Sequence, residues 1–409
     1  MELTAIDLNN LDQFVAGVPH EIFTEMRRSG PYWQIEPDGT YPNMPAGTGY
    51  WNFARYDDVV LINKDNQTFS SHRGSALLPD MPEADLEAQR MMMLNMDPPM
   101  HTRYRLLINK GFTPRMVGQL EEHIRVLAGR IIDEALERRD VDFVVDISSE
   151  LPLQVIAELM GVPQEDRHLV FDWSNRMIGS QDPEFMAEPG AELLASMELY
   201  GYAHKLADEK RINPHDDLMS ILTSVDINGD KLSELELDMF FMLLAVAGNE
   251  TTRNLMAHAM LALLEHPAEL AALYAEPSLL PTAVEEFLRW GTPVMHFRRT
   301  VTRDTDVNGF PVKEGDKVCI WYIAANRDDT VINDPFRFDV RRDPNPHVAF
   351  GGGGPHFCLG ANLARLEIRV MFEELIRRQP RIEQSGPVQR LRSNFINGIK
   401  HLPIALTPA

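Results

Sequence analysis

The amino-acid sequence predicts an α+β fold that is mainly helical and carries a smaller β-rich lobe. A long apolar helix is expected over about residues 237–265, and amphipathic helical patterns recur through much of residues 115–211. Residues 292–318 instead alternate apolar and polar side chains between Gly and Pro turns, which is typical of short strands. Long helices with a small, separate set of strands define the predicted class.

The chain, residues 1–409, is expected to form one domain, because no internal repeat or low-complexity linker divides it. Its β-rich parts are predicted at roughly residues 32–75, 292–325 and 380–409, and the remainder is predicted to be helical. A hydrophobic content of 44% is enough for a large buried core.

Composition excludes several classes of function. The net charge of −22 argues against nucleic-acid binding, which needs a basic surface. The two cysteines, Cys319 and Cys358, do not make a disulfide framework, so a reducing cytoplasm is the expected location. Neither a basic and apolar targeting segment at the N-terminus nor a membrane-spanning run of apolar residues is predicted.

Residues 350–360 form the segment around which a site is predicted. Four glycines and a proline make a turn, and apolar residues at helical spacing after Cys358 predict a helix that ends before Pro380. A helix N-terminus favours a thiolate. Haem iron accepts a single cysteine ligand, whereas an iron–sulfur cluster or structural zinc needs several. The alternative is a cysteine that packs as a small apolar side chain.

The long helix carries the second candidate segment. Ser233 and Glu236 form a capping box at its start, and His266-Pro267 ends it. Its middle contains residues that suit a buried helix poorly, Ala247-Gly248-Asn249-Glu250-Thr251-Thr252. This predicts a local distortion that frees a backbone carbonyl and places hydroxyl and carboxyl groups for proton transfer. The alternative is a bend with an ordinary threonine-to-backbone hydrogen bond.

Together these segments resemble the cytochrome P450 family. Phe350-Gly351-Gly352-Gly353-Gly354-Pro355-His356-Phe357-Cys358-Leu359-Gly360-Ala361 is similar to the family's haem-ligand loop, and residues 247–252 are similar to its distal oxygen-activation motif. The resemblance runs in order from Asp97 to the C-terminus. It implies the cytochrome P450 fold, with haem b (iron protoporphyrin IX) held between the long central helix and the cysteine loop and helix.

The resemblance also implies roles for individual residues. Cys358 is the predicted iron ligand, with Phe350, Ala247 and Gly360 beside the haem. The predicted catalytic residues are Glu250, which passes protons inward, and Thr251, which binds oxygen and water; Thr252 is the competing candidate. Four side chains are predicted to bind the haem propionates: His101, Arg105, Arg299 and His356. The alternative for His101 and Arg105 is a solvated pair of side chains on a surface helix.

A structural trio and a set of substrate residues follow from the same resemblance. Glu286 and Arg289, three apart on a helix, are predicted to pair with Arg342 and to serve folding and haem incorporation. Apolar residues predicted to border the substrate, which core packing explains nearly as well, are Leu94, Leu243, Val246, Ala247, Val294, Met295, Phe297, Phe395 and Ile396.

The function implied is a haem-thiolate monooxygenase that hydroxylates a hydrophobic molecule such as a steroid side chain, a branched isoprenoid or a terpenoid. Electrons are expected from a ferredoxin with its NAD(P)H-dependent reductase, at a surface that includes Arg103, Lys110, Arg365 and Arg369. Two alternatives remain: a non-catalytic gas sensor or carrier, and a peroxide-driven oxygenase. Members of the second type usually lack the acid–threonine pair that this chain has.

Overall fold

The computed structural model describes residues 6–37, 39–40, 47–109, 112, 118, 120–179, 181–185, 190–227 and 229–408. The chain forms two compact units, each assembled from separate segments. The first unit comprises Met1–Leu106, Val294–Arg337 and Pro346–Cys358. The second comprises Leu107–Pro293, Phe338–Asn345 and Leu359–Ala409.

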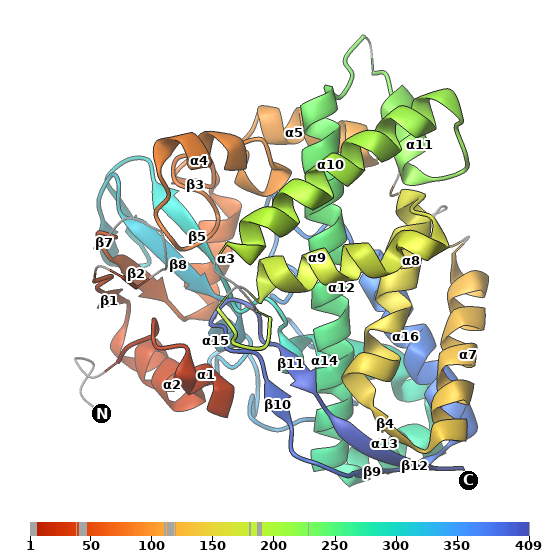
Figure 1. The fold of residues 1–409 in the computed structure, drawn as a ribbon. Coiled ribbons are helices and arrows are strands. Elements are labelled where there is room, and N and C mark those ends of the chain that lie inside the picture. Colours follow the sequence, from red (N-terminus) through yellow and green to blue (C-terminus); the bar gives the residue numbers. More distant parts are fainter. Residues whose placement is uncertain are drawn as a thin grey trace. The chain divides into compact units, whose positions relative to one another are not determined.

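A five-stranded sheet forms the centre of the first unit (Figure 1). Its strands, in spatial order, are β1 (Tyr32–Gln34), β2 (Tyr50–Phe53), β8 (Lys317–Trp321), β5 (His296–Val301) and β3 (Phe69–Ser70). β2 and β8 pair in parallel, whereas the other neighbours are antiparallel. The chain between β5 and β8 forms a small antiparallel hairpin of β6 (Thr305–Val307) and β7 (Phe310–Val312).

The central strand β8 explains how this sheet is buried. All five of its residues are buried, and alternate residues point to opposite faces. Cys319 and Trp321 pack into one apolar cluster with Phe14 and Phe23, while Ile320 packs into another with Ile62. The first unit's helices are α1 (Asp12–Ala16), α2 (His20–Ser29), α3 (Tyr56–Lys64), α4 (Glu83–Gln89), the 3₁₀ turn η2 (Met93–Asn95) and α15 (Tyr322–Ala325); α5 (Met100–Ile108) crosses the unit boundary.

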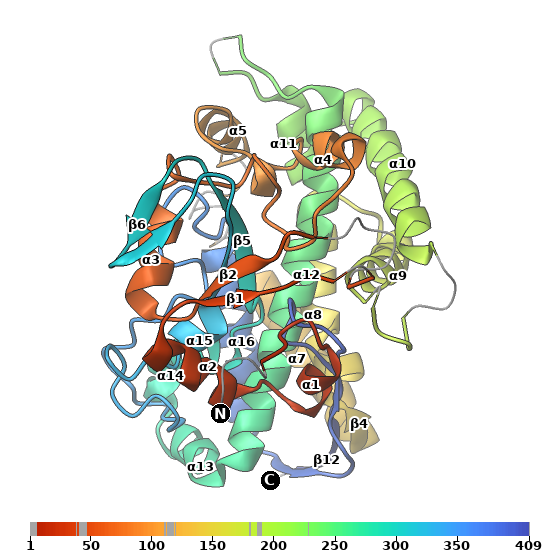
Figure 2. The same cartoon turned by 90° about the vertical axis from the view of Figure 1, so that its left-hand side faces the viewer.

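In the second unit the long helix α12 (Glu234–Glu265) contacts α8, α9, α10, α14 and α16, and both views show it among those helices (Figures 1 and 2). The bounds of the other helices are α7 (Glu121–Arg138), α8 (Glu150–Met160), α9 (Arg167–Ile178), α10 (Ala191–Ile212), α11 (Leu218–Ser224), α13 (Pro267–Ala275), α14 (Leu280–Gly291) and α16 (Ala361–Arg378). The short helical turns are η4 (Phe143–Ser148, π), η5 (Gln164–Asp166) and η6 (Pro277–Leu279).

Two small sheets complete this unit. One has the order β4 (Asp140–Asp142), β12 (Pro403–Thr407), β9 (Arg381–Gln384), and the other pairs β10 (Gln389–Arg390) with β11 (Ile399–His401). Among the described residues, no helix combines the length and the apolar character that a bilayer crossing needs.

Helix α12 confirms its predicted start and end. Ser233 Oγ accepts a hydrogen bond from Glu236 N at 3.3 Å, and Glu236 Oε2 accepts one from Ser233 N at 2.8 Å. The helix continues without a break through residues 247–252. A Cβ on Gly248 would lie 2.8 Å from Ile156 Cδ1, so this glycine allows α8 to pack closely. Thr251 Oγ1 donates to Ala247 O at 2.8 Å, the bond of the alternative interpretation.

The helix predicted after Cys358 is also confirmed, as α16, which begins three residues later and ends two residues before Pro380. Helix α5 carries His101 and Arg105, so the two residues lie on one helix as predicted.

Candidate active site

The cysteine loop owes its shape to four consecutive glycines. Gly351, Gly352, Gly353 and Gly354 have φ values of 99°, 62°, 102° and 80°, which side chains other than glycine adopt only with strain. A Cβ on Gly354 would also collide with the carbonyl oxygen of Asn63 near the end of α3. The loop closes through Cys358 N, which donates to Phe350 O at 3.1 Å. Cys358 itself is exposed, so the loop presents an accessible sulfur.

The four predicted propionate ligands all belong to the first unit. The ring centroids of His101 and His356 are 4.4 Å apart, and Arg105 Nη1 donates to Pro355 O at 3.0 Å. Arg299 is 3% exposed and donates to Arg298 O at 2.7 Å. Helix α5, strand β5 and the cysteine loop therefore contribute to one basic cluster.

The electrostatics of this cluster fit an anionic ligand. Burial, followed by the charge of Arg105, lowers the pKa of His101 to about 4. Burial, then Arg299 and His101, holds the pKa of His356 well below its usual range. His101 is 1% exposed, and its Nε2 has no hydrogen-bond partner among the described residues. A buried polar atom without a partner is costly, so a haem carboxylate would supply the partner that His101 Nε2 lacks.

The accessible face of α12 carries the predicted distal hydroxyl. Leu243, Ala247 and Thr251 lie four residues apart, on one face of the helix, and all three keep accessible surface. Thr252 is 4% exposed and lies on the buried side. This difference supports Thr251 over Thr252 as the residue that meets a ligand.

The neighbouring carboxyl group of Glu250 is enclosed. It is 1% exposed, and it accepts a hydrogen bond from Arg253 Nη2. Arg253 Nη1 also donates to Asn175 Oδ1 of α9 at 3.0 Å, and its guanidinium lies 5.6 Å from the centre of the Phe171 ring. Burial raises the pKa of Glu250, and the charge of Arg253 opposes that rise.

Sequence reasoning missed Arg253, Asn175 and Asn63. Arg253 follows Glu250 by three residues, a helical spacing that could have identified the pair. The sequence spacing of Asn175 and Asn63 does not identify them. Asn175 meets Arg253, and the Asn63 carbonyl meets Gly354, only through tertiary packing.

The structural trio comes together in the second unit. Arg289 Nε and Nη2 each donate to the carboxylate of Glu286 at 2.7 Å, and both residues are 0% exposed. Arg342 Nε donates to Glu286 Oε2 at 3.2 Å, and Asn345 Nδ2 donates to the same oxygen at 3.0 Å.

The predicted substrate residues differ in burial and are divided between the units. Met295 and Ile396 are 1% and 2% exposed. Met295 packs in the apolar cluster with Trp321, so core packing accounts for it. Those that keep accessible surface are Leu94, Val294 and Phe297 in the first unit and Leu243, Val246, Ala247 and Phe395 in the second.

The basic residues predicted for the ferredoxin surface have intramolecular roles where contacts are known. Arg365 Nε and Nη2 donate to Glu285 at 2.7 and 2.8 Å. Arg369 pairs with Glu121 of α7 at 2.9 Å and with Glu373 at 2.8 Å. Arg103 lies on α5, and Lys110 lies outside the described residues.

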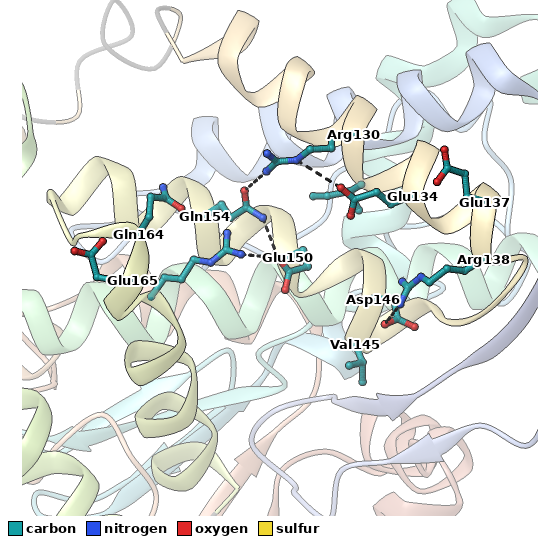
Figure 3. Close-up of a pocket in the computed structure, with 12 residues that line it drawn as sticks. Arg130, Glu134, Glu137, Arg138, Val145, Asp146, Glu150, Gln154, Gln164 and Glu165 are labelled. Carbon is teal, nitrogen blue, oxygen red and sulfur yellow. Dashed lines mark hydrogen bonds and ion pairs between the residues drawn. The ribbon is translucent and has the colours of Figure 1, made fainter.

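A groove of about 960 Å³ on the second unit contains none of the predicted site residues (Figure 3). Its lining is charged: Arg138 pairs with Asp146 at 3.0 Å, and Arg130 Nη2 donates to Gln154 Oε1 at 2.9 Å. Ile131 and Val145 are its only apolar lining residues among those described. The groove therefore does not suit a hydrophobic substrate.

Comparisons with known proteins identify the family. The family description "Cytochrome P450" matches residues 195–379. The chain is 43% identical over 404 residues to a steroid C26-monooxygenase of Rhodococcus jostii (strain RHA1), covering 97% of this chain and 84% of that protein. It is 40% identical over 410 residues to a methyl-branched lipid omega-hydroxylase of Mycobacterium tuberculosis (strain ATCC 25618 / H37Rv), covering 99% and 94%.

Solved structures agree with this. The Mycobacterium marinum cytochrome P450 CYP268A2 in complex with pseudoionone superposes with a TM-score of 0.89 at 37% identity, covering 96% of each chain. CYP109E1 from Bacillus megaterium in complex with testosterone gives a TM-score of 0.83 at 33% identity, covering 97% of this chain and 99% of that one. The predicted fold and enzyme class are confirmed: the chain belongs to the cytochrome P450 family of haem b-dependent monooxygenases.

Proposed function

We propose that this monooxygenase hydroxylates the branched end of a hydrophobic molecule, such as a steroid side chain, a branched isoprenoid or a terpenoid. The observation that carries the proposal is the similarity, over nearly the whole chain, to two enzymes whose names describe related positions: steroid C26 and the omega end of a methyl-branched lipid. Both names place the oxidation at the far end of a branched apolar chain. Leu243 and Ala247 on the accessible face of α12 are compatible with such a substrate.

Bound haem supplies the chemistry that inserts one oxygen atom from O₂ into a C–H bond. We assign Cys358 as its thiolate ligand, because the glycine loop presents this sulfur to the surroundings. Its propionates are assigned to His101, Arg105, Arg299 and His356, supported by the unpartnered His101 Nε2. Phe350, Ala247 and Gly360 complete the proposed haem contacts.

Proton delivery is assigned to Glu250 and Thr251. The raised pKa of the buried Glu250 carboxyl favours a group that holds a proton and releases it inward. Thr251 Oγ1 donates to Ala247 O, so its lone pairs remain available to accept a hydrogen bond on the accessible face.

Electrons are proposed to come from a ferredoxin with its NAD(P)H-dependent reductase, in the cytoplasm, where Cys319 and Cys358 would not be oxidised to disulfides. Arg103, Lys110, Arg365 and Arg369 remain predicted contacts. Turnover with NAD(P)H, reductase and ferredoxin should exceed turnover with hydrogen peroxide alone. The reverse result would favour the peroxide-driven alternative.

A matched pair of probes tests the substrate class. Cholesterol carries a branched side chain, whereas testosterone has a similar ring system without one. We expect cholesterol to shift the haem Soret band and to give a product hydroxylated at the end of its side chain. A methyl-branched fatty acid should likewise be preferred to its straight-chain isomer. Hydroxylation confined to the rings of testosterone, with no reaction at any branched chain, would contradict the proposal.

A further inference from the structure

Residues 181–185, which follow α9, are held by a charged cluster on the second unit. Asp182 is 1% exposed, and each of its two carboxylate oxygens accepts a hydrogen bond from residues 392–400. Its Oδ1 accepts from Lys400 Nζ of β11 at 2.9 Å, and its Oδ2 accepts from Arg392 N at 2.8 Å. Arg392 Nη1 returns a hydrogen bond to Gln181 O at 3.1 Å. The segment is thus joined to both ends of residues 392–400.

Glu184 and Asp142 also belong to this cluster, and both contact the imidazole of His401. Glu184 accepts from Lys400 Nζ at 2.7 Å and faces His401 Nε2 at 3.0 Å. His401 Nδ1 lies 2.6 Å from Asp142 Oδ2 of β4. Both ring nitrogens therefore face carboxylate oxygens. A neutral imidazole can donate from only one nitrogen, so only the imidazolium form satisfies both contacts.

Of the two carboxylates that face His401, Asp142 is anchored by backbone hydrogen bonds, whereas Glu184 is more exposed. Asp142 Oδ1 accepts from Val144 N at 2.9 Å and from Leu402 N at 3.1 Å, which ties it to η4 and to the backbone after His401. The side chain of Glu184 is 37% exposed. Loss of the proton from His401 therefore weakens the contact that holds residues 181–185.

The turn at residues 392–400, to which the cluster joins residues 181–185, carries two of the predicted substrate residues, Phe395 and Ile396. Phe395 N and Ile396 N both donate to Ser393 Oγ at 3.1 Å, so the turn is compact. Its ends are Arg392, bound by Asp182 and Gln181, and Lys400, bound by Asp182 and Glu184. Motion of residues 181–185 is in this way linked to the position of the turn.

We propose that Asp142, Asp182, Glu184, Lys400 and His401 form a protonation-dependent latch, which fixes residues 181–185 to the turn 392–400 and slows ligand release while His401 is charged. The latch itself requires no assumption about the substrate. Only its link to ligand release depends on the proposed place of Phe395 and Ile396 beside the bound molecule.

The expected direction with pH follows from the charges around His401. Burial lowers the pKa of His401, but hydrogen bonds to Asp142 and Glu184 outweigh it, so the pKa is raised. The latch is then closed below the usual histidine pKa and opens as pH rises through the raised value. The pKa of Asp182 is lowered, because hydrogen bonds from Arg392 N, Glu184 N and Lys400 outweigh its burial.

Lys400 and Glu184, which flank His401, stay ionised over this range. Lys400 has a raised pKa, because Glu184 and Asp182 outweigh its burial, and Glu184 has a lowered pKa, because Lys400 and His401 outweigh its burial. Asp146 accepts from Asp142 N and pairs with Arg138. His401 is therefore the group whose charge changes near neutral pH.

Hydrogen exchange of the haem-loaded protein, read by mass spectrometry at about pH 6 and about pH 9, tests the latch. After correction for the intrinsic rates, we expect peptides covering residues 181–185 and 392–402 to exchange at least about tenfold faster at the higher pH. His401→Lys should retain protection at both values, and His401→Gln should exchange fast at both. His123→Gln is the matched control, because His123 Nε2 pairs with Glu158 at 2.5 Å elsewhere on the unit.

The latch is overturned if His401→Gln stays as protected as the unmodified protein at low pH, or if His401→Lys keeps the original pH dependence. If His401→Gln disturbs Asp142 and the fold, Glu184→Gln leaves that pair intact and must show the fast exchange. Release of 4-phenylimidazole, followed at the Soret band, should accelerate in His401→Gln and Glu184→Gln and not in His401→Lys. Unchanged release despite fast exchange would overturn the link to the ligand, independently of the proposed substrate.

Discussion

Arg253 donates a hydrogen bond to Glu250 one helical turn earlier in α12, and both side chains are buried. The same guanidinium binds Asn175 of α9. The proposed proton carrier is thus paired with a cation, and that cation is positioned by a second helix.

We expect Arg253→Met to destabilise the protein in a pH-dependent way. Without the guanidinium, the buried Glu250 would lose the charge that opposes its raised pKa. An acid whose pKa is higher in the folded state loses stability as pH rises from its unfolded value through its folded value. Urea unfolding should show a loss of about 3–5 kcal/mol near pH 8 and a smaller loss near pH 5.

The double variant Glu250→Gln/Arg253→Met is the control for this effect. It removes both charges, so its stability should vary with pH no more than that of the unmodified protein. An Arg253→Met effect that persists unchanged in the double variant would show that the loss comes from packing against Phe171 and not from Glu250.

Thr251→Ala and Thr252→Ala should separate proton delivery from packing. Thr251 keeps accessible surface, whereas Thr252 is 4% exposed. We expect Thr251→Ala to give at least about tenfold less product per NAD(P)H consumed, with more peroxide released. Thr252→Ala should lower thermal stability and leave this ratio unchanged. Equal ratios in the two variants would argue against the assignment.

Haem affinity should depend on pH through His101. Its pKa is lowered to about 4 by burial and by Arg105, and a propionate partner would raise it. Haem binding would then take up protons, and affinity would fall as pH rises between the free and bound pKa values. The rate of haem transfer to excess apomyoglobin measures this. His101→Asn should abolish the trend, while Arg73→Gln, at an exposed ion pair in the same unit, should leave it intact.

Gly354→Ala should be much more damaging than Gly353→Ala. Both have positive φ values, 80° and 102°, so both substitutions introduce backbone strain of about 1–2 kcal/mol. At Gly354 the new Cβ would also meet the Asn63 carbonyl, whereas at Gly353 it would lie 3.2 Å from Cε of the flexible Lys64 side chain. The fraction of purified protein that gives the carbon monoxide difference spectrum of a haem thiolate should be lost only in Gly354→Ala.

Substitutions in the buried trio of Glu286, Arg289 and Arg342 should lower the free energy of unfolding, because the trio is assigned to folding and not to catalysis. Glu286→Gln leaves Arg289, which is 0% exposed, without its carboxylate, and we expect a loss of about 3–5 kcal/mol in urea unfolding. Arg341→Gln, at a half-exposed residue 3.8 Å from Glu269, should change stability by less than about 1 kcal/mol. Similar losses in both would contradict the role assigned to Glu286.

Features that depend on neighbouring residues could be predicted from the sequence. The capping box at Ser233 and the strand at residues 296–301 are examples, because hydrogen bonding and burial there follow local spacing. The trio of Glu286, Arg289 and Arg342 was reached by resemblance, and the structure brings its members into contact.

Features that depend on tertiary packing were missed or misread. Gly248 suggested a distortion of α12, whereas its small size accommodates Ile156 of α8. The parallel pairing of β2 with β8 and the contact between Arg253 and Asn175 join distant parts of the chain, and neither leaves a pattern in one segment alone. Met295 lies in a buried apolar cluster, and its contact with a substrate stays a prediction.

The pairing of Asn52 with Cys319 in that parallel ladder has a consequence for synthesis. The first unit needs strands from both sides of residues 107–293, and the assigned iron ligand, Cys358, follows the last of these strands. On the ribosome, β2 must therefore wait with one edge unpaired until β8, encoded after residue 293, has emerged. With Cys358 as the assigned ligand, incorporation of the prosthetic group would be a late event, and a nascent chain arrested before residue 358 would be a target for chaperones.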